Sequence, residues 1–185
     1  MSAEGRAKFA VFLLTLLAFG AVVVVTLLLL VLVSGKGHAA TCPPPDPDAR
    51  PVVRLAAGEL RSLAALAWAE NRSSGYCGML SIASVVVNRL QQNPKIYGAT
   101  ITQVINKPYQ FSVFGRTDPN RRKMAKVAED DDEFVTAVLA AIAAVSGVEN
   151  TGRALYFYSG RAPYWSHGMV VTAKQYGHVF LKPRP

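Results

Sequence analysis

Glu70 is the residue of this sequence whose type and position most clearly favour chemistry. It follows Leu63 and Ala67 at helical spacing, so a predicted helix carries all three on one stripe. A carboxylate is costly to bury unless it is paired or neutral, and burial raises its pKa, as a general acid at neutral pH requires. The alternative interpretation is that Glu70 pairs with Arg72 or Arg89, or lies in solvent at a frayed helix end.

The sequence offers no evident partner carboxylate for Glu70. Glycosidases commonly use two carboxyl groups about 5–9.5 Å apart, whereas Glu59 would lie roughly 16 Å away along the same helix. The acids from Glu129 to Glu133 precede an apolar helical stripe, so we expect them to complement a helix N-terminus instead of binding a metal. One carboxyl suffices if the substrate supplies the nucleophile, as the C6 hydroxyl of N-acetylmuramic acid does in forming a 1,6-anhydro ring.

Aromatic side chains are concentrated in predicted loops and strand ends of the second half of the chain. Flat rings pack on the apolar faces of pyranoses and leave polar edges for hydroxyl groups. These rings therefore favour a sugar polymer as substrate, although part of the set must form the core of a small sheet. The set comprises Tyr109, Phe111, Tyr156, Tyr158, Tyr164, Trp165 and Tyr176.

Other catalytic and binding motifs are missing from the sequence. It contains no GxSxG, GxxxxGK(S/T) or HExxH pattern and no CxxC pair. His167 and His178 are the only histidines of the predicted domain, so we expect neither a metal nor another cofactor. The formal net charge of +8 suits an anionic partner. Nucleic acid is not expected, because Arg121–Lys123 is the only basic run and lacks interleaved aromatics. The sequence makes no prediction of oligomeric state.

The N-terminal part of the sequence predicts a membrane anchor. After a short tail at residues 1–8, residues 9–33 contain no charge, and about 20 apolar residues span a bilayer as a helix. A cleaved signal peptide is the alternative, but its apolar core is usually only about 7–15 residues. Arg6 and Lys8 favour a cytoplasmic N-terminus. We expect a single-pass protein of the inner or cytoplasmic membrane, with its catalytic domain on the periplasmic or extracytoplasmic side.

The remaining chain predicts a linker and one α+β domain. Residues 34–54 form a Pro-rich linker, in which Pro43–Pro47 is expected to be an extended spacer. Residues 55–185 place helical patterns first and short strand-like runs last, as an α+β domain with a C-terminal antiparallel sheet does. The predicted strands cover 154–158, 169–172 and 178–181. The predicted buried faces of two later helices are Met79, Ile82, Val86 and Leu90, then Phe134, Val138, Ile142 and Val145.

The two cysteines, Cys42 and Cys77, cannot supply a thiolate zinc site by themselves. In an exported domain they can pair as a disulfide that ties the start of the domain to the loop after Glu70. Two free thiols are the alternative, because the sequence does not supply the Cα separation that a disulfide requires.

Five short segments in order carry a resemblance to a known family. They resemble the SleB-like cell-wall hydrolase family, the spore-cortex-lytic type of peptidoglycan-degrading enzyme. One departure from the family's pattern is Ser74, which stands where a second glutamate often follows the first. The segments are Leu66–Arg72, Val85–Arg89, Tyr109–Ser112, Ala154–Tyr158 with Trp165, and Gly177–Phe180.

The resemblance implies a small lysozyme-like helical domain whose partner is peptidoglycan. It implies that Glu70 is the catalytic acid and base in cleavage of the MurNAc–GlcNAc strand, by a lytic transglycosylase or muramidase reaction. An N-acetylmuramoyl amidase and a non-catalytic, membrane-tethered peptidoglycan-binding module are the alternatives. The expected substrate-binding residues are Asn88, Tyr109, Gln110, Phe111, Ser112, Tyr156, Tyr158, Trp165 and His178.

Overall fold

The computed structural model describes residue 42, residues 52–114 and residues 117–185. The chain divides into two compact units, Met1–Thr41 and Cys42–Pro185. The predicted tail, the predicted transmembrane helix and most of the predicted linker lie outside the described residues. Among the residues that are described, none of the helices has the length and hydropathy needed to cross a bilayer.

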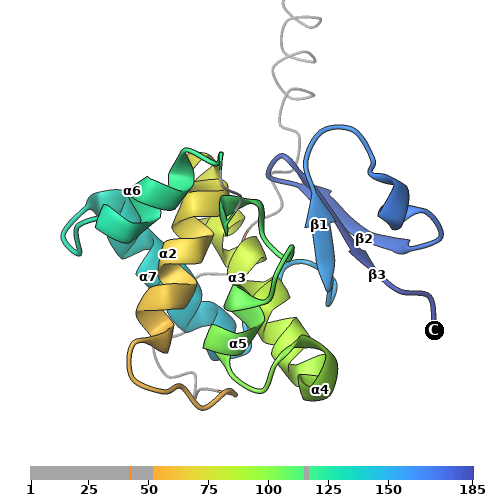
Figure 1. Ribbon diagram of the computed structural model, residues 1–185, viewed down its shortest axis with the longest axis horizontal. Coiled ribbons are helices and arrows are strands. Elements are labelled where there is room, and N and C mark those ends of the chain that lie inside the picture. The colour runs from red at the N-terminus through yellow and green to blue at the C-terminus, as the bar shows by residue number, and fades with distance from the viewer. Residues whose placement is uncertain (1–41, 43–51, 115–116) are drawn as a thin grey trace, which may run out of the picture. The chain divides into compact units, whose positions relative to one another are not determined.

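Three helices form the core of the described unit (Figure 1). They are α2 (Glu59–Asn71), α3 (Gly75–Gln92) and α7 (Asp132–Val145), and each packs against the other two. Helix α2 is rich in Leu and Ala, which favour helix and allow neighbouring helices to approach closely. It is buried on several sides because α5 and α6 also pack on it. Fully buried side chains at the centre include Leu63, Leu66, Ile82, Val86 and Phe134.

Short helices fill the connections between the three core helices. Asn93 caps α4 by accepting from the amides of Lys95 and Ile96, and Thr100 caps α5 by accepting from Gln103 N at 3.2 Å. The short elements are α4 (Pro94–Tyr97), α5 (Ile101–Asn106) and α6 (Asn120–Lys126), with 3-10 turns η1 (Arg72–Ser74), η2 (Ser112–Phe114) and η3 (Tyr164–Ser166).

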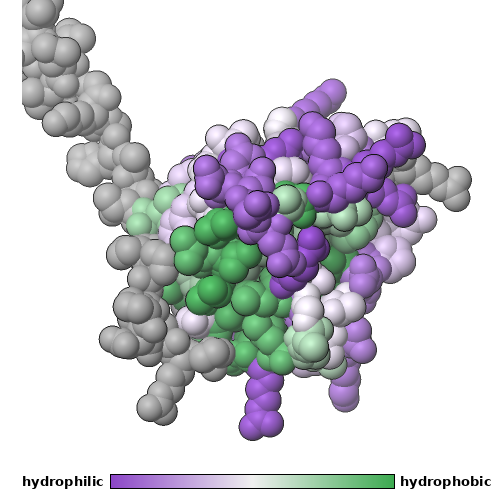
Figure 2. Space-filling view, turned by 90° about the vertical axis from the view of Figure 1, so that its left-hand side faces the viewer, coloured by the Kyte–Doolittle hydropathy of each residue, from purple (hydrophilic) through white to green (hydrophobic). Residues whose placement is uncertain are grey.

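The acidic run before α7 is a helix start, as predicted. Asp131 caps the helix by accepting from Phe134 N at 2.9 Å. The predicted buried face of α7 is wrong at Ile142, which is 39% exposed. The helix instead turns a run of alanines inward, because small side chains let α2 and α3 approach closely. Val135, Leu139 and Ile142 remain exposed. The face of the molecule shown in Figure 2 has a central apolar area with polar residues above it and to its right.

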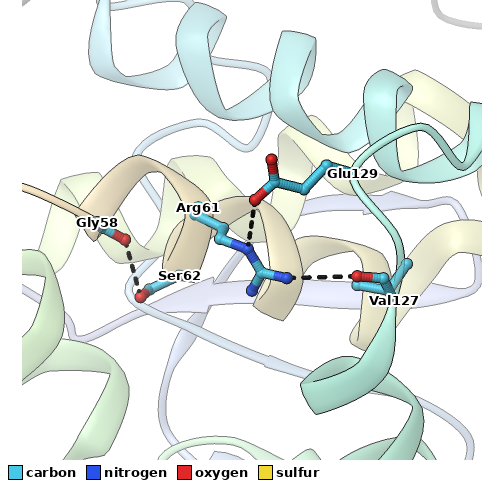
Figure 3. Close-up of polar contacts among 5 residues, drawn as sticks. All are labelled: Gly58, Arg61, Ser62, Val127 and Glu129. Atoms are coloured by element: carbon cyan, nitrogen blue, oxygen red, sulfur yellow. Dashed lines mark hydrogen bonds and ion pairs between the residues drawn. The ribbon is translucent and has the colours of Figure 1, made fainter.

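An arginine on α2 holds the connection between α6 and α7 (Figure 3). Arg61 Nε donates to Glu129 Oε1 at 3.2 Å, and its Nη2 donates to the carbonyl oxygen of Val127 at 3.3 Å. The next residue, Ser62, donates through Oγ to the carbonyl oxygen of Gly58 at 3.0 Å and closes the start of α2. Both Arg61 and Glu129 are largely exposed, so the ion pair contributes little to stability.

The strands form one antiparallel sheet in the order β1-β3-β2, beside α3 (Figure 1). The strands are β1 (Tyr156–Tyr158), β2 (Val170–Gln175) and β3 (His178–Lys182). Tyr176 and Gly177 join β2 to β3, and both have positive φ, 51° and 75°. Two such residues between paired strands make a tight hairpin turn, so His178 begins β3 directly after a constrained turn. Helices followed by a short antiparallel sheet confirm the predicted α+β order.

Candidate active site

The carboxylate of Glu70 stands at the C-terminal end of α2 and is held by the segment that follows α5. Val113 N donates to Glu70 Oε1 at 3.0 Å, and Ser112 Oγ donates to Oε2 at 3.0 Å. Neither arginine of the alternative interpretation pairs with it. Arg72 Nη2 donates to Asn120 Oδ1, whereas Arg89 is buried and its Nε donates to the carbonyl oxygen of Leu155 at 2.6 Å.

The surroundings of Glu70 raise the pKa of its carboxyl group above the ordinary value. The largest cause is burial, which disfavours the charged form. The hydrogen bonds from Val113 and Ser112 oppose this rise, the charge of Asp118 adds to it, and His178 acts to lower it. The net effect is a carboxyl that keeps its proton to a higher pH than an exposed glutamate does.

Asp118 is the acid that acts on Glu70, but its carboxylate has another role. Its Oδ1 accepts from Asn120 N at 2.7 Å at the start of α6. Asp118 is also not among the described residues that line the cavity beside Glu70. It therefore influences the proton affinity of Glu70 without standing across a bound substrate from it, as the second carboxyl of a glycosidase pair would.

A cavity of about 310 Å³ opens beside Glu70 and collects most of the predicted cleft residues. Its walls come from α2, the segment around η2, the end of β1 with the loop after it, and the start of β3. Helices and sheet each supply one side, so the site depends on their packing. The lining residues are Glu70, Gln110, Ser112, Phe157, Tyr158, Ser159, Arg161, Pro163, Trp165 and His178.

The hairpin turn orients the imidazole of His178. Its Nδ1 lies 3.0 Å from the carbonyl oxygen of Tyr176 and 3.2 Å from Asn71 Nδ2. A protonated Nδ1 donates to the carbonyl, and an unprotonated Nδ1 accepts from Asn71. Asn71 Nδ2 donates to the same carbonyl at 3.1 Å, and Ser74 Oγ donates to it at 3.4 Å. Gly78 makes room for Asn71, because a Cβ at position 78 would lie 2.9 Å from Asn71 Nδ2. The turn and the end of α2 are thus joined through one carbonyl.

Trp165 supplies an aromatic surface at the sheet side of the cavity. Its ring lies 6.0 Å from that of Tyr156 and 6.2 Å from that of Tyr158, centre to centre. It is 47% exposed, so part of the ring remains open to a ligand. Tyr156 is braced in turn by a 2.9 Å hydrogen bond between its hydroxyl and that of Tyr97. A ring held from behind and open in front suits stacking against a sugar.

Four of the predicted substrate-binding residues do not line this cavity. Asn88 is buried in α3 and donates to the carbonyl oxygen of Ala154 at 3.1 Å. Phe111 is only 5% exposed and packs beneath Arg89 and against Phe157. Tyr156 supports Trp165 from behind. Tyr109 is fully exposed with a φ of 62° and stands outside the cavity.

The structure adds residues that sequence reasoning missed. Phe157, Ser159, Arg161 and Pro163 line the cavity, and Asn71 holds the turn behind it. The sequence contains one usable signal for Ser159, Arg161 and Pro163, since they fall between a predicted strand and Trp165, where loops carry binding residues. Nothing in the sequence singles out Asn71, because helix ends contain asparagine for structural reasons as well.

The predicted disulfide stays a prediction. Cys42 and Cys77 are free thiols, and the two thiol groups are hydrogen bonded to each other. Asn150 bridges them, because its Nδ2 lies 3.9 Å from Cys42 Sγ and donates to the carbonyl oxygen of Cys77 at 3.1 Å. In the described part of the chain, no cluster of three or more His, Cys, Asp or Glu side chains could hold a metal ion.

Solved structures with the same fold include two catalytic domains from Bacillus species. The catalytic domain of the Bacillus cereus SleB protein matches with a TM-score of 0.56 at 22% identity, covering 79% of this chain and 100% of that one. The catalytic domain of the germination-specific lytic transglycosylase SleB from Bacillus anthracis matches with a TM-score of 0.56 at 22% identity, covering 69% of this chain and 96% of that one. At this identity the likeness shows the fold alone.

Sequence comparison identifies the family. No curated protein matches the chain significantly. The family model described as cell wall hydrolase matches residues 73–181, which is more than half of the chain. The matched stretch begins after Glu70 and includes η2, the sheet and the loop that carries Trp165. The chain therefore belongs to the cell wall hydrolase family.

Proposed function

We propose that this protein degrades peptidoglycan by cleaving the MurNAc–GlcNAc glycan strand as a lytic transglycosylase. The observation that carries the proposal is the position of Glu70, a carboxyl of raised pKa in an aromatic cavity where it is the only acid among the described lining residues. Membership of the cell wall hydrolase family supports the substrate class. The lytic transglycosylase activity in the name of the Bacillus anthracis SleB domain supports the reaction type.

In the first step, the protonated carboxyl of Glu70 acts as a general acid. It donates its proton to the oxygen that links C1 of MurNAc to the next GlcNAc, and the C1–O bond breaks as C1 acquires oxocarbenium character. The GlcNAc side leaves as a neutral alcohol. Ser112 Oγ and Val113 N then stabilise the carboxylate that forms, since both already donate to Glu70.

In the second step, the same carboxylate acts as a base. It takes the proton of the MurNAc C6 hydroxyl while that oxygen attacks C1, which closes a 1,6-anhydro ring and restores the protonated Glu70. No water and no second carboxyl are consumed. This cycle fits a cavity in which Asp118 is engaged at the start of α6 and not in the lining.

The aromatic side of the cavity would hold the sugar rings during both steps. Trp165, braced by Tyr156 and Tyr158, offers a stacking surface for one pyranose face. Gln110, which lines the cavity, and the hydroxyl of Tyr158 can hydrogen bond to N-acetyl and hydroxyl groups. Such positioning confines the C6 hydroxyl near C1, which favours ring closure over attack by water.

We further propose that the enzyme works from a membrane. The uncharged run at residues 9–33 would be a single-pass anchor in the inner or cytoplasmic membrane, with the cell wall hydrolase domain on the periplasmic or extracytoplasmic side. Extraction of membranes at alkaline pH tests the anchor. The chain is expected in the pellet, and full release into the supernatant would exclude a spanning helix.

Mass spectrometry of fragments released from purified sacculi tests the reaction. The wild-type chain is expected to release muropeptides with 1,6-anhydro-muramyl ends, and Glu70→Gln none. Glu59→Gln is the matched control, because Glu59 lies on the same helix but outside the cavity. Reducing muramyl ends would mean hydrolysis, free stem peptides an amidase, and binding without release a non-catalytic module. Each of these outcomes contradicts the proposal.

A further inference from the structure

A cluster of polar contacts joins the two cysteines to the β2–β3 turn. Besides the hydrogen bond between the two thiols, the Tyr176 side chain is hydrogen bonded to Cys77. Asn150 and Gln175 extend the cluster, since Gln175 Nε2 donates to the carbonyl oxygen of Asn150 at 2.5 Å. Cys42, at the start of the described unit, is thereby connected to the last residues before β3.

The turn at the other end of this cluster holds a residue of the active site. Tyr176 adopts a positive φ of 51°, which is costly for a residue with a side chain. Its side chain contacts Cys77, while its carbonyl accepts from Asn71 and lies 3.0 Å from His178 Nδ1. Contacts on both sides of Tyr176 therefore keep it in this conformation. His178 in turn lines the cavity with Glu70 and acts electrostatically on it.

We propose that Cys42 and Cys77 form a disulfide, and that this cross-link fixes the Tyr176–Gly177 turn and thereby positions His178 beside Glu70. Asn150 Nδ2 lies 3.9 Å from Cys42 Sγ and 3.1 Å from the carbonyl oxygen of Cys77, which places the two cysteines beside each other. The disulfide would be a covalent modification of this chain. Its consequence for catalysis rests on the proposed function of Glu70. In this account His178 is a positioning residue, because it acts on the reaction through Glu70.

The oxidation is a thiol–disulfide exchange with an oxidised dithiol protein outside the cytoplasm. One of the two cysteines attacks a sulfur of the oxidant as its thiolate and forms a mixed disulfide. The other cysteine then displaces the oxidant sulfur as it loses its proton. The chain gives up two electrons and two protons, and the oxidant leaves as a dithiol.

Thiol counting on the full-length chain tests the cross-link itself. The chain is purified in detergent without reductant, denatured, and treated with N-ethylmaleimide before intact mass measurement. Its only two cysteines are expected to take no adduct, and to take two after prior reduction. The melting temperature is expected to fall by roughly 10 °C on reduction, because the cross-link closes a loop of about 36 residues. Two adducts without reduction would overturn the proposal.

Histidine NMR signals and steady-state kinetics test the coupling to the turn. Reduction is expected to shift the imidazole signal of His178, which reports on this turn. The signal of His167, which is exposed, is expected to stay in place. Reduction should also lower kcat on sacculi about tenfold, because small misplacements of catalytic geometry are expensive. If the thiol count confirms the disulfide but His178 and kcat do not respond to reduction, the coupling is wrong.

A single substitution provides the control. Cys42→Ser removes the cross-link and keeps the contact between Cys77 and Tyr176. It should resemble the reduced wild type in kcat and in the His178 signal, and should not respond to reductant. A response of this variant to reductant would show that the effect does not come from the pair. If the wild type cleaves no sacculi, the proposed function fails, while the adduct count and the His178 signal still decide this inference.

Discussion

The two ends of α2 carry two glutamates whose pKa values are shifted in opposite directions. At the first turn, Glu59 is only 3% exposed, and its carboxylate accepts from Thr102 N at 2.8 Å and Ala56 N at 2.9 Å. Burial acts to raise its pKa, but these hydrogen bonds outweigh burial and the pKa is lowered. At the last turn, burial outweighs the hydrogen bonds from Val113 and Ser112, and the pKa of Glu70 is raised.

The difference separates a carboxylate that stabilises the fold from one that can do chemistry. Glu59 has two backbone amides directed at its two oxygens, and it lies near the helix N-terminus, where negative charge is favoured. Glu70 has one backbone amide and a hydroxyl, stands at the opposite end of the helix, and opens onto a cavity. Burial alone does not make a general acid. The balance between burial and donors does.

The largest expected effect is the loss of activity on changing Glu70→Gln. Because general acid and base catalysis contributes about 10²–10⁴-fold, and Glu70 serves in both steps, kcat is expected to fall by at least about 10³-fold. The unfolding free energy should not fall, since the carboxylate is disfavoured at this site. Muropeptide release and denaturant unfolding check the two parts. Retained activity, or a large loss of stability, would remove the contrast with Glu59.

Glu59→Gln should show the converse pattern. Its amide group cannot accept from both backbone donors, so we expect a loss of about 1–3 kcal/mol in unfolding free energy at neutral pH with kcat unchanged. The pKa of Glu59 is lowered in the folded state, so its stabilisation is present above its ordinary pKa and is lost as pH falls through the folded value. The effect of the substitution should therefore diminish on acidification, which unfolding curves at several pH values would reveal. An effect that is the same at every pH would contradict this origin.

Ser112→Ala should widen the difference in pKa between Glu70 and Glu59. Removing a hydroxyl that lowers the pKa of Glu70 is expected to raise that pKa. The basic limb of the pH–rate profile, which reports loss of the Glu70 proton, should then shift to higher pH. At neutral pH we expect a change in kcat of only a few-fold, since Val113 N still donates to Oε1. A shift toward lower pH would contradict the assignment of Glu70 as the acid.

Arg61→Ala provides the smallest effect and a third carboxylate for comparison. Its partner Glu129 is mostly exposed, so removing the ion pair should change the unfolding free energy by no more than about 0.5 kcal/mol. The comparison with Glu59 isolates what burial and backbone donors contribute to the stabilisation by a carboxylate. Thermal melts at low and high salt measure the change in stability caused by Arg61→Ala. A loss of unfolding free energy comparable with that of Glu59→Gln would contradict the expected order of effects.

The helical half of the molecule could be predicted from sequence better than the site. Helical spacing predicts α2 and α3, and the acidic run predicts the start of α7. The inward face of α7 is predicted correctly at Phe134 and Val145 and wrongly at Ile142, because alanines form much of the packed face and their hydropathy is lower than that of Ile142 on the exposed side. Hydropathy ranks side chains by polarity, whereas close helix packing selects them by size.

The sequence predicts Glu70 and part of the cavity wall, but it does not separate the lining residues from the residues that support them. Glu70 was identified by a carboxylate in an apolar stripe, and Ser112 and His178 by a family resemblance. Asn88 and Phe111 belong to the same motifs yet support the walls from behind, because a motif does not distinguish lining from support. The hydrogen bonds to Glu70 come from residues 42 and 43 positions later in the chain. The position of these two residues beside Glu70 depends on the path of the chain after α5, which no local sequence pattern encodes.

Titration of the side-chain carboxyl carbons by NMR tests the central claim most directly. With the full-length chain labelled with ¹³C at glutamate, the Glu70 and Glu59 signals are assigned by Glu70→Gln and Glu59→Gln and followed from acid to neutral pH. We predict that Glu70 titrates above, and Glu59 below, the range of the exposed glutamates. If Glu70 titrates at or below Glu59, the site does not hold a proton for catalysis and the account is wrong.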